Sequence, residues 1–404
     1  MNISHLQHIQ PLFDEAVKQN KIAGLNCLIY KDGKEIGYWQ SGFRDRDNKI
    51  PYSRDTILRM YSMTKPVTSI AAMILVEQGK LDLGEELGVY LPSFNNLQVC
   101  TDKGRNGTPH KAWNKILIQD LLNMTSGYTY GAWSEDSPLG EHLTSQLIND
   151  LNKDAEQENK ITTQDVAERL SKIPVSFEPG TAYNYGLSAD ILGAIIEKVS
   201  GMKFSLFLKK NIFEPLGMND TAFFVPSEKQ NRLSKVYKTI LNDDGTRFME
   251  EFRNCNLGIQ ADMKNEPAFE SGGAGLCSTV DDYMKFALML TQGGEFNGKR
   301  VLQKRTVEYL SQARLRDNLQ QSFNNMMPHL SGYTYCNLMR VAFEPGKCKA
   351  VTQQGEFGWD GWLGPYVSVD LNNKLTIVMT MQRTDAGTTD VTRRMKNIVY
   401  TGIN

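Results

Sequence analysis

The sequence lacks several motifs that define common enzyme classes. Its six cysteines form no C-x-x-C pair, its five histidines form no H-E-x-x-H motif, and no serine lies in a complete G-x-S-x-G motif. These absences leave no signature of a zinc site or a redox dithiol, and they count against an α/β-hydrolase. We therefore expect reduced cysteines, no metal and no cofactor.

The sequence also lacks a charge surplus and a long apolar run. Lys and Arg number 45 against 46 Asp and Glu, a net charge of −1, which argues against nucleic acid or an anionic membrane as a partner. Residues 1–5 open a polar stretch with no apolar signal core, and the apolar run at residues 66–76 is too short to span a bilayer. We expect a cytoplasmic protein with no membrane partner, and the sequence leaves its oligomeric state open.

The most informative pattern present is S-M-T-K at residues 62–65. Its spacing places the Ser62 hydroxyl and the Lys65 amine on one face of a helix's first turn, as a nucleophile beside a base. Pro66 is tolerated only in such a first turn, and the apolar residues that follow predict a buried central helix ending near Gly79. Free N–H groups at that helix start would stabilise an oxyanion formed by attack of Ser62.

Simpler interpretations of both residues exist. Ser62 could be an ordinary helix cap and Lys65 a solvated amine, but a cation in the first turn opposes the helix dipole. Burial would lower the pKa of Lys65 further and make it a better base. A second S-x-x-K at residues 200–203 follows a helical pattern and contains Gly201, so it is interpreted as a helix end.

The order of helical and strand patterns indicates an α/β fold of the α+β type. A helix is expected at residues 4–19, a hairpin at 25–40, strands at 332–343, 361–369 and 374–381, and a final helix at 385–400. This order predicts an antiparallel sheet, flanked by the terminal helices and split in sequence by a large helical insertion. The predicted domains are residues 1–58 with 318–404, and a mainly helical domain at 59–317. The polar stretch 133–164 suggests a surface insertion or a lid.

Several segments, in order, resemble motifs of one superfamily. They are Y-S-M-T-K-P at residues 61–66, L-L-N-M-T-S-G at 121–127, the region 179–193, the Gly-rich turn and helix at 272–283, and F-G-W-D-G at 357–361. Together they resemble the serine β-lactamase and penicillin-recognising proteins, specifically class C β-lactamases and the related esterases. The resemblance implies a β-lactamase/transpeptidase-like fold with an active site between the sheet and the helical part.

Two departures from the class C pattern bear on function. The second motif offers Tyr185, at the family's distance from Leu192 and Gly193, but lacks the usual Asn; Tyr183 is a weaker candidate for the same role. In the third motif Trp359 replaces the usual Lys. This combination resembles the esterase branch, whose members hydrolyse short acyl esters or transfer acyl groups.

The resemblance implies a role for each candidate site residue. The catalytic residues would be Ser62, Lys65 and Tyr185, the oxyanion hole the N–H groups of Ser62 and Trp362, and the substrate-binding residues Trp359, Asp360 and Gly361. Which of the lysine and the tyrosine takes the first proton stays open. The substrate would be a small ester or amide.

Three functions are considered. The first is a serine hydrolase or acyltransferase acting on short-chain carboxylic esters. The second is a D-Ala-D-Ala carboxypeptidase or weak β-lactamase of the same fold, against which the absent third-motif lysine counts. The third is a ligand-binding or sensor protein without catalysis, against which an intact set of Ser62, Lys65 and Tyr185 counts.

Overall fold

The computed structural model describes residues 3–403 and confirms a mixed α/β fold around a large antiparallel sheet. The eight strands of this sheet lie in the order β12-β13-β14-β15-β16-β1-β2-β3. Their bounds are β1 Gly24–Lys31, β2 Lys34–Asp45, β3 Ile50–Pro51, β12 Tyr333–Cys336, β13 Met339–Ala342, β14 Phe357–Gly358, β15 Tyr366–Asp370 and β16 Leu375–Met381. The sheet thus joins the two ends of the chain through the pairing of β1 with β16.

The predicted N-terminal hairpin and the strand at 374–381 are confirmed, but two other strand predictions need correction. Residues 332–343 form two strands, β12 and β13, because Asn337 and Leu338 both adopt positive φ and make a tight turn. The strand predicted from Gly361 begins only at Tyr366. Before it the chain turns, with the Gly361 N–H donating to the Pro365 carbonyl at 2.8 Å.

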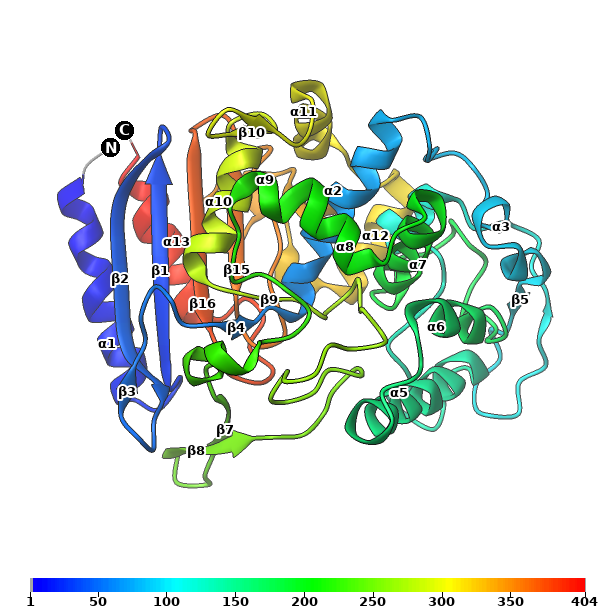
Figure 1. Ribbon diagram of the computed structural model, residues 1–404, viewed down its shortest axis with the longest axis horizontal. Coiled ribbons are helices and arrows are strands. Elements are labelled where there is room, and N and C mark those ends of the chain that lie inside the picture. The colour runs from blue at the N-terminus through cyan, green and yellow to red at the C-terminus, as the bar shows by residue number, and fades with distance from the viewer. Residues whose placement is uncertain (1–2, 404) are drawn as a thin grey trace.

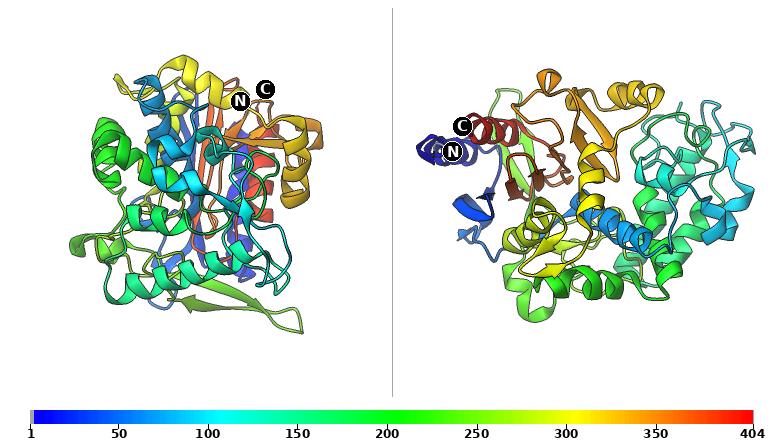
Figure 2. Two further views of the ribbon diagram at one scale, coloured as in Figure 1. Left: turned by 90° about the vertical axis from the view of Figure 1, so that its right-hand side faces the viewer. Right: turned by 90° about the horizontal axis from the view of Figure 1, so that it is seen from above.

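Two helices from the ends of the chain cover one face of the sheet (Figures 1 and 2). They are α1, Ile9–Lys18, and α13, Asp390–Thr401, which lie in contact with each other. Their apolar sides pack on strand residues such as Ile29, Ile377 and Met379 in a separate hydrophobic cluster. The amphipathic patterns at both ends of the sequence are explained by this packing.

The helices from the middle of the chain lie on the opposite side of the sheet, and several of them pack on one another rather than on the strands (Figure 1). Of these, α10, Val280–Thr291, lies directly on β1, β15 and β16. The others are α2 Thr64–Glu77, α3 Leu87–Tyr90, α4 Ile118–Leu122, α5 Leu139–Gln157, α6 Thr163–Leu170, α7 Ser188–Ser200, α8 Phe204–Leu208, α9 Glu214–Leu216, α11 Lys304–Gln312 and α12 Asp317–Met326. The domain boundaries at 58 and 317 stay a prediction.

Short two-stranded ladders lie outside the main sheet. They are β4 Leu58–Arg59 with β9 Cys277–Ser278, β5 Gln98–Val99 with β6 His110–Lys111, β7 Val236–Leu241 with β8 Arg247–Phe252, and β10 Glu295–Phe296 with β11 Lys299–Arg300. The first of them leads into the segment that carries Ser62.

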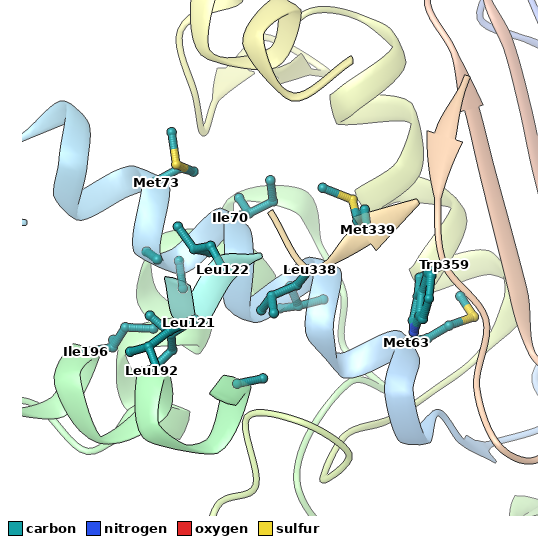
Figure 3. Close-up of a cluster of buried hydrophobic side chains, with 14 of the residues drawn as sticks. Met63, Ile70, Met73, Leu121, Leu122, Leu192, Ile196, Leu338, Met339 and Trp359 are labelled. Atoms are coloured by element: carbon teal, nitrogen blue, oxygen red, sulfur yellow. The ribbon is translucent and has the colours of Figure 1, made fainter. Parts of the chain in front are cut away.

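The predicted buried central helix is α2. Every residue from Thr64 to Leu75 is buried, and Gly79 follows the helix with a positive φ of 64°. The helix packs against α7, and Figure 3 shows Ile70 and Met73 of α2 in the cluster that includes Leu192 of α7. A helix that is apolar on nearly all sides is stable only at such a central position.

The stretch 133–164, predicted to be a surface insertion or a lid, packs in part against the rest of the helical region. It contains α5, whose buried positions include Glu141, His142, Leu147 and Leu151.

No helix in the part of the chain described by the structure is long and apolar enough to cross a membrane. All six cysteines are free thiols. A cytoplasmic location stays a prediction.

Candidate active site

Ser62 lies in a 3₁₀ turn, Tyr61–Met63, directly before α2. The turn follows β4, and its geometry requires a left-handed conformation of Tyr61, with φ of 44°. A non-glycine residue in this region costs about 1–3 kcal/mol and persists only where the surroundings hold it. The Tyr61 ring packs edge-on against Trp362 at 5.0 Å between centroids, which is one such support. The half-buried Ser62 is thereby presented at the start of the helix.

Lys65 is fully buried, and its amine points back at Ser62. Lys65 Nζ donates to Ser62 Oγ at 3.2 Å, to the Tyr130 hydroxyl at 2.8 Å and to the Gly273 carbonyl at 2.8 Å. Burial lowers the pKa of Lys65 to about 7, against the opposing effect of the Asp190 carboxylate. The Lys65 amine is therefore deprotonated more easily near neutral pH than that of an ordinary lysine.

Tyr185 also lies next to the Lys65 amine. Its ring centroid is 4.7 Å from Lys65 Nζ, and its hydroxyl accepts a hydrogen bond from Trp359 Nε1 at 2.9 Å. Burial raises the pKa of the Tyr185 phenol, and hydrogen bonds with Ser62 and Trp359 offset only part of that rise. The phenol is therefore protonated at neutral pH.

Tyr183 does not belong to this group. Its ring packs against Phe323 and Tyr335 at centroid distances of 5.0 and 5.2 Å, and its buried hydroxyl has no hydrogen-bond partner among residues 3–403. The geometry therefore favours Tyr185 as the second-motif tyrosine.

Tyr130 is a site residue that the sequence reasoning missed. It follows the T-S-G turn of residues 125–127, and its ring lies 5.6 Å from that of Tyr185. Its hydroxyl is a direct partner of Lys65, and burial raises its pKa well above that of a free phenol. An aromatic residue three positions after Gly127 was the only sequence signal that could have pointed to it.

The Gly-rich turn at residues 272–276 holds the amine of Lys65 rather than a phosphate. Asp190 Oδ1 accepts from the Ser271 hydroxyl at 2.6 Å and from the Gly273 N–H at 3.1 Å, while the Gly273 carbonyl accepts from Lys65. A Cβ on Gly273 would lie 2.8 Å from Asp190 Oδ2 and 3.2 Å from the Tyr130 hydroxyl. Glycine is thus required here by close approach. Asp190 was also missed from the sequence.

The side chains of the third-motif segment differ in how far they are buried. Trp359 is only 4% exposed and lies beneath Tyr185, with its ring 4.9 Å from that of Tyr335. Figure 3 shows Trp359 at the end of the apolar cluster that surrounds α2. Its one polar atom is already engaged by Tyr185. This hydrogen bond holds the Tyr185 phenol in place, and a role of Trp359 in substrate binding stays a prediction.

The residues that follow Trp359 lie close to the segment that carries Ser62. A Cβ on Gly361 would be 2.4 Å from the carbonyl oxygen of Met60, so the turn before β15 and the Ser62 segment approach closely. The Trp362 indole donates to Asp385 Oδ1 at 2.8 Å. Asp360 accepts a hydrogen bond from the Thr388 hydroxyl, and burial raises the pKa of its carboxyl group. The Asp360 carboxyl also acts on Lys65, where it opposes the lowering of the lysine pKa.

No group of three or more potential metal ligands occurs among the residues that the structure describes. The arrangement contains a hydroxyl, a buried amine and two protonated phenols in one hydrogen-bonded cluster. Such a set can activate a nucleophile and move a proton without further groups.

Comparison with known proteins identifies the family. The Beta-lactamase family profile matches residues 9–399, so the chain belongs to the β-lactamase family. The chain is 29% identical to protein Rv1367c of Mycobacterium tuberculosis, over 85% of this chain and 81% of the relative. It is 25% identical to esterase EstB of Burkholderia gladioli, over 92% and 88% respectively. It is 27% identical to the ML-236A carboxylate methylbutanoyltransferase of Penicillium citrinum, over 88% and 82%.

Solved structures agree on the fold. EstCE1, described as a hydrolase with promiscuous acyltransferase activity, superimposes with a TM-score of 0.80 at 22% identity, covering 98% of this chain and 99% of that one. Unliganded simvastatin synthase from Aspergillus terreus, a selenomethionyl derivative, gives 0.79 at 23% identity, covering 98% of both chains. The fold is that of the β-lactamase/transpeptidase-like proteins. With the family and these relatives, the protein is a serine hydrolase or acyltransferase.

Proposed function

We propose that the protein cleaves uncharged short-chain carboxylic esters through an acyl-enzyme on Ser62. The observation that carries this proposal is the 3.2 Å contact between Lys65 Nζ and Ser62 Oγ, made by an amine whose pKa burial lowers to about 7. A large fraction of Lys65 is then an unprotonated amine, which can accept the hydroxyl proton.

Lys65 is the better first base of the two candidates. The raised pKa of Tyr185 keeps its phenol protonated, so it serves as a donor. In acylation Ser62 Oγ attacks the ester carbonyl carbon while Lys65 takes its proton. The carbon–oxygen bond to the alcohol then breaks, the leaving oxygen takes the Tyr185 proton, and Lys65 returns a proton to Tyr185. Water repeats the sequence on the acyl-enzyme and releases the acid.

The oxyanion would be held by the N–H groups of Ser62 and Trp362. The close approach of Gly361 to Met60 supports this assignment, because it brings the following residue near the Ser62 turn. One such donor contributes roughly 3–4 kcal/mol to transition-state stabilisation.

The absence of a lysine in the third motif favours uncharged substrates. A lysine there would make a charge-assisted contact with a substrate carboxylate, worth roughly 1.5–3 kcal/mol. Trp359 offers no charge, and its only donor is committed to Tyr185. The esterase name of the Burkholderia gladioli relative agrees with this preference.

A paired rate measurement tests the substrate class. On one preparation, kcat/KM for p-nitrophenyl acetate or butyrate should exceed that for nitrocefin by at least tenfold. A penicillin or cephalosporin turned over faster than every simple ester would instead support the β-lactamase or carboxypeptidase alternative. Failure of a fluorophosphonate to label the protein would support the sensor alternative.

Acyl transfer to an alcohol that carries a carboxylate is a second candidate function. A pocket of about 510 Å³ is lined by Arg59 and Phe252, and the Phe252 ring lies 5.5 Å from that of Trp362. Arg59 is buried, and its Nε has no hydrogen-bond partner in the described chain. The pocket is also lined by Lys235, Arg253, Glu156, Glu251 and Asp262. The name of the Penicillium citrinum relative, a carboxylate methylbutanoyltransferase, agrees with an acidic acceptor.

Product analysis separates transfer from hydrolysis. With a p-nitrophenyl ester as donor, an alcohol bearing a carboxylate should be acylated at least tenfold faster than its methyl ester. Arg59→Met should remove this preference while hydrolysis continues. Equal use of both acceptors by the wild type would contradict transfer to an acidic alcohol.

A further inference from the structure

A small cavity lined by basic side chains lies between α13, the 3₁₀ turn Pro328–Leu330 and strands β12, β13 and β15. Its lining residues are His329, Leu330, Tyr333, Arg340, Lys349, Ala350, Tyr366, Thr388, Thr392, Arg393 and Lys396. Four of them are Lys or Arg, and none is Asp or Glu. A polar cavity lined by Lys and Arg, and by no carboxylate, is suited to an anion.

Arg340 lines the cavity, and one of its guanidinium nitrogens has no hydrogen-bond acceptor among the described residues. The side chain is 2% exposed, and its Nη2 donates to Glu356 Oε1 at 3.0 Å and to the Val367 carbonyl at 3.1 Å. Its Nη1 is buried and has no partner in residues 3–403. The guanidinium lies 4.5 Å from the Tyr366 ring centroid, a contact that supplies no acceptor atom. A buried donor without a partner costs about 1–3 kcal/mol, so a bound acceptor would relieve this cost.

A second buried cation, Lys396, also lines the cavity. Lys396 is 3% exposed and donates to Glu356 Oε2 at 2.8 Å and to the Tyr333 hydroxyl at 2.9 Å. Glu356 is therefore shared by two cations. Burial acts to raise the pKa of Glu356, but Lys396 and Arg340 hold it at about 2. One carboxylate is thus shared by two buried cations, and the buried Asp360 carboxyl also acts on Arg340. Neither acidic residue lines the cavity, so the charged side chains that face it are cationic.

The entrance adds further positive charge. Lys349 is exposed, and Arg393 is half-buried with its Nη1 donating to the Thr388 carbonyl at 3.2 Å. Neither has an ion-pair partner in the part of the chain that the structure describes. Thr392 and Arg393 also lie in the first turn of α13, where the helix dipole favours negative charge.

We propose that this cavity binds a small oxyanion of the phosphate or sulfate class. Arg340 and Lys396 would hold it from within, and Lys349 and Arg393 would hold it at the entrance. The cavity has a volume of about 30 Å³. A water molecule needs roughly 10–15 Å³ by this measure, so the cavity accepts something larger than one water. The site is distinct from the Ser62 site and does not rest on the proposed function.

Isothermal titration calorimetry with inorganic phosphate and with sulfate, at constant ionic strength set by sodium chloride, tests the proposal. The wild type should bind one oxyanion per chain. The double variant Lys349→Gln/Arg393→Gln should bind at least tenfold more weakly. The matched control is Lys347→Gln/Arg394→Gln, which removes two exposed cations from the same segments outside the cavity and should bind as the wild type does.

Thermal unfolding in chloride buffer verifies that both double variants fold, which is expected because neither changes a fully buried residue. Absence of binding by the folded wild type would overturn the proposal. An equal loss in both double variants would also overturn it, because the effect would then be general surface charge. Stronger binding of chloride than of either oxyanion would contradict the ligand class.

Discussion

Trp359 Nε1 donates a hydrogen bond to the Tyr185 hydroxyl at 2.9 Å. This bond connects the residue that replaces the third-motif lysine with the tyrosine of the second motif. Trp359, which we predicted to bind substrate, is almost fully buried. In the proposed mechanism its hydrogen bond fixes the position of the proton donor, Tyr185. The proposed site therefore has no third-motif cation to bind substrate, and a hydrogen bond from Trp359 holds the Tyr185 phenol in place.

Trp359→Phe should reduce ester turnover by about tenfold. Phenylalanine keeps the packing against Tyr335 but removes the donor, and leaving a buried group without its partner costs about 1–3 kcal/mol. Steady-state kinetics with p-nitrophenyl acetate measure the effect. Trp113→Phe, at a position that is 81% exposed, is the matched control and should change nothing. Equal rates for Trp359→Phe and the wild type would remove the positioning role.

The three tyrosines near Lys65 should differ sharply in their effects. Tyr185→Phe should lower turnover by about a hundredfold, as loss of a general acid does. Tyr130→Phe should lower it by about tenfold, because it removes a hydrogen-bond partner of Lys65. Tyr183→Phe should be nearly neutral, because its hydroxyl makes no hydrogen bond in the described chain. The three variants change the same atom and serve as controls for one another. A large loss in Tyr183→Phe alone would shift the second-motif assignment by two residues.

The pH profile should report the titration of Lys65. Below its pKa the amine is protonated and cannot accept the Ser62 proton, whereas above it the amine is free. We therefore expect kcat/KM to rise with pH, to level off above about 7, and to fall about tenfold per unit below that value.

Asp190→Asn provides a directional test of the same titration. Asp190 opposes the lowering of the Lys65 pKa, so its removal should move the acid limb of the profile to lower pH. A shift to higher pH would contradict the assignment of that limb to Lys65. A merely structural role for Asp190 would lower the rate without moving the limb.

Gly273→Ala should reduce turnover by at least tenfold. The added Cβ would press on Asp190 Oδ2 and the Tyr130 hydroxyl, both of which surround the amine of Lys65. The matched control is Gly346→Ala, where a Cβ meets nothing within 4 Å. Circular dichroism and thermal unfolding establish that both variants fold. Unchanged kinetics in a folded Gly273→Ala would contradict the account of the Gly-rich turn.

Short-range patterns predicted much of this arrangement. The S-x-x-K spacing, Pro66 and the apolar run gave the buried α2 with Ser62 and Lys65 at its start, because these features depend on neighbouring residues. Tyr185 followed from its distance to Leu192 and Gly193. The end of α7 at Gly201 was likewise visible, and its φ of 68° explains why the second S-x-x-K is a helix end.

Contacts between distant segments were not predictable in the same way. Tyr130, Asp190 and Gly273 come from three separate segments, and only the tertiary fold brings them to Lys65. The β12–β13 turn was missed because Leu338 adopts a left-handed conformation, which apolar residues rarely do. The left-handed Tyr61 was hidden for the same reason.

Intact-protein mass spectrometry of samples quenched during turnover of p-nitrophenyl acetate tests the central claim most directly. The wild type should gain the mass of one acetyl group, and peptide mapping should place it on Ser62. Ser62→Ala should gain none, while Ser200→Ala, which alters the second S-x-x-K, should acylate as the wild type does. An acetyl group on another residue, or wild-type turnover by a folded Ser62→Ala, would contradict the account.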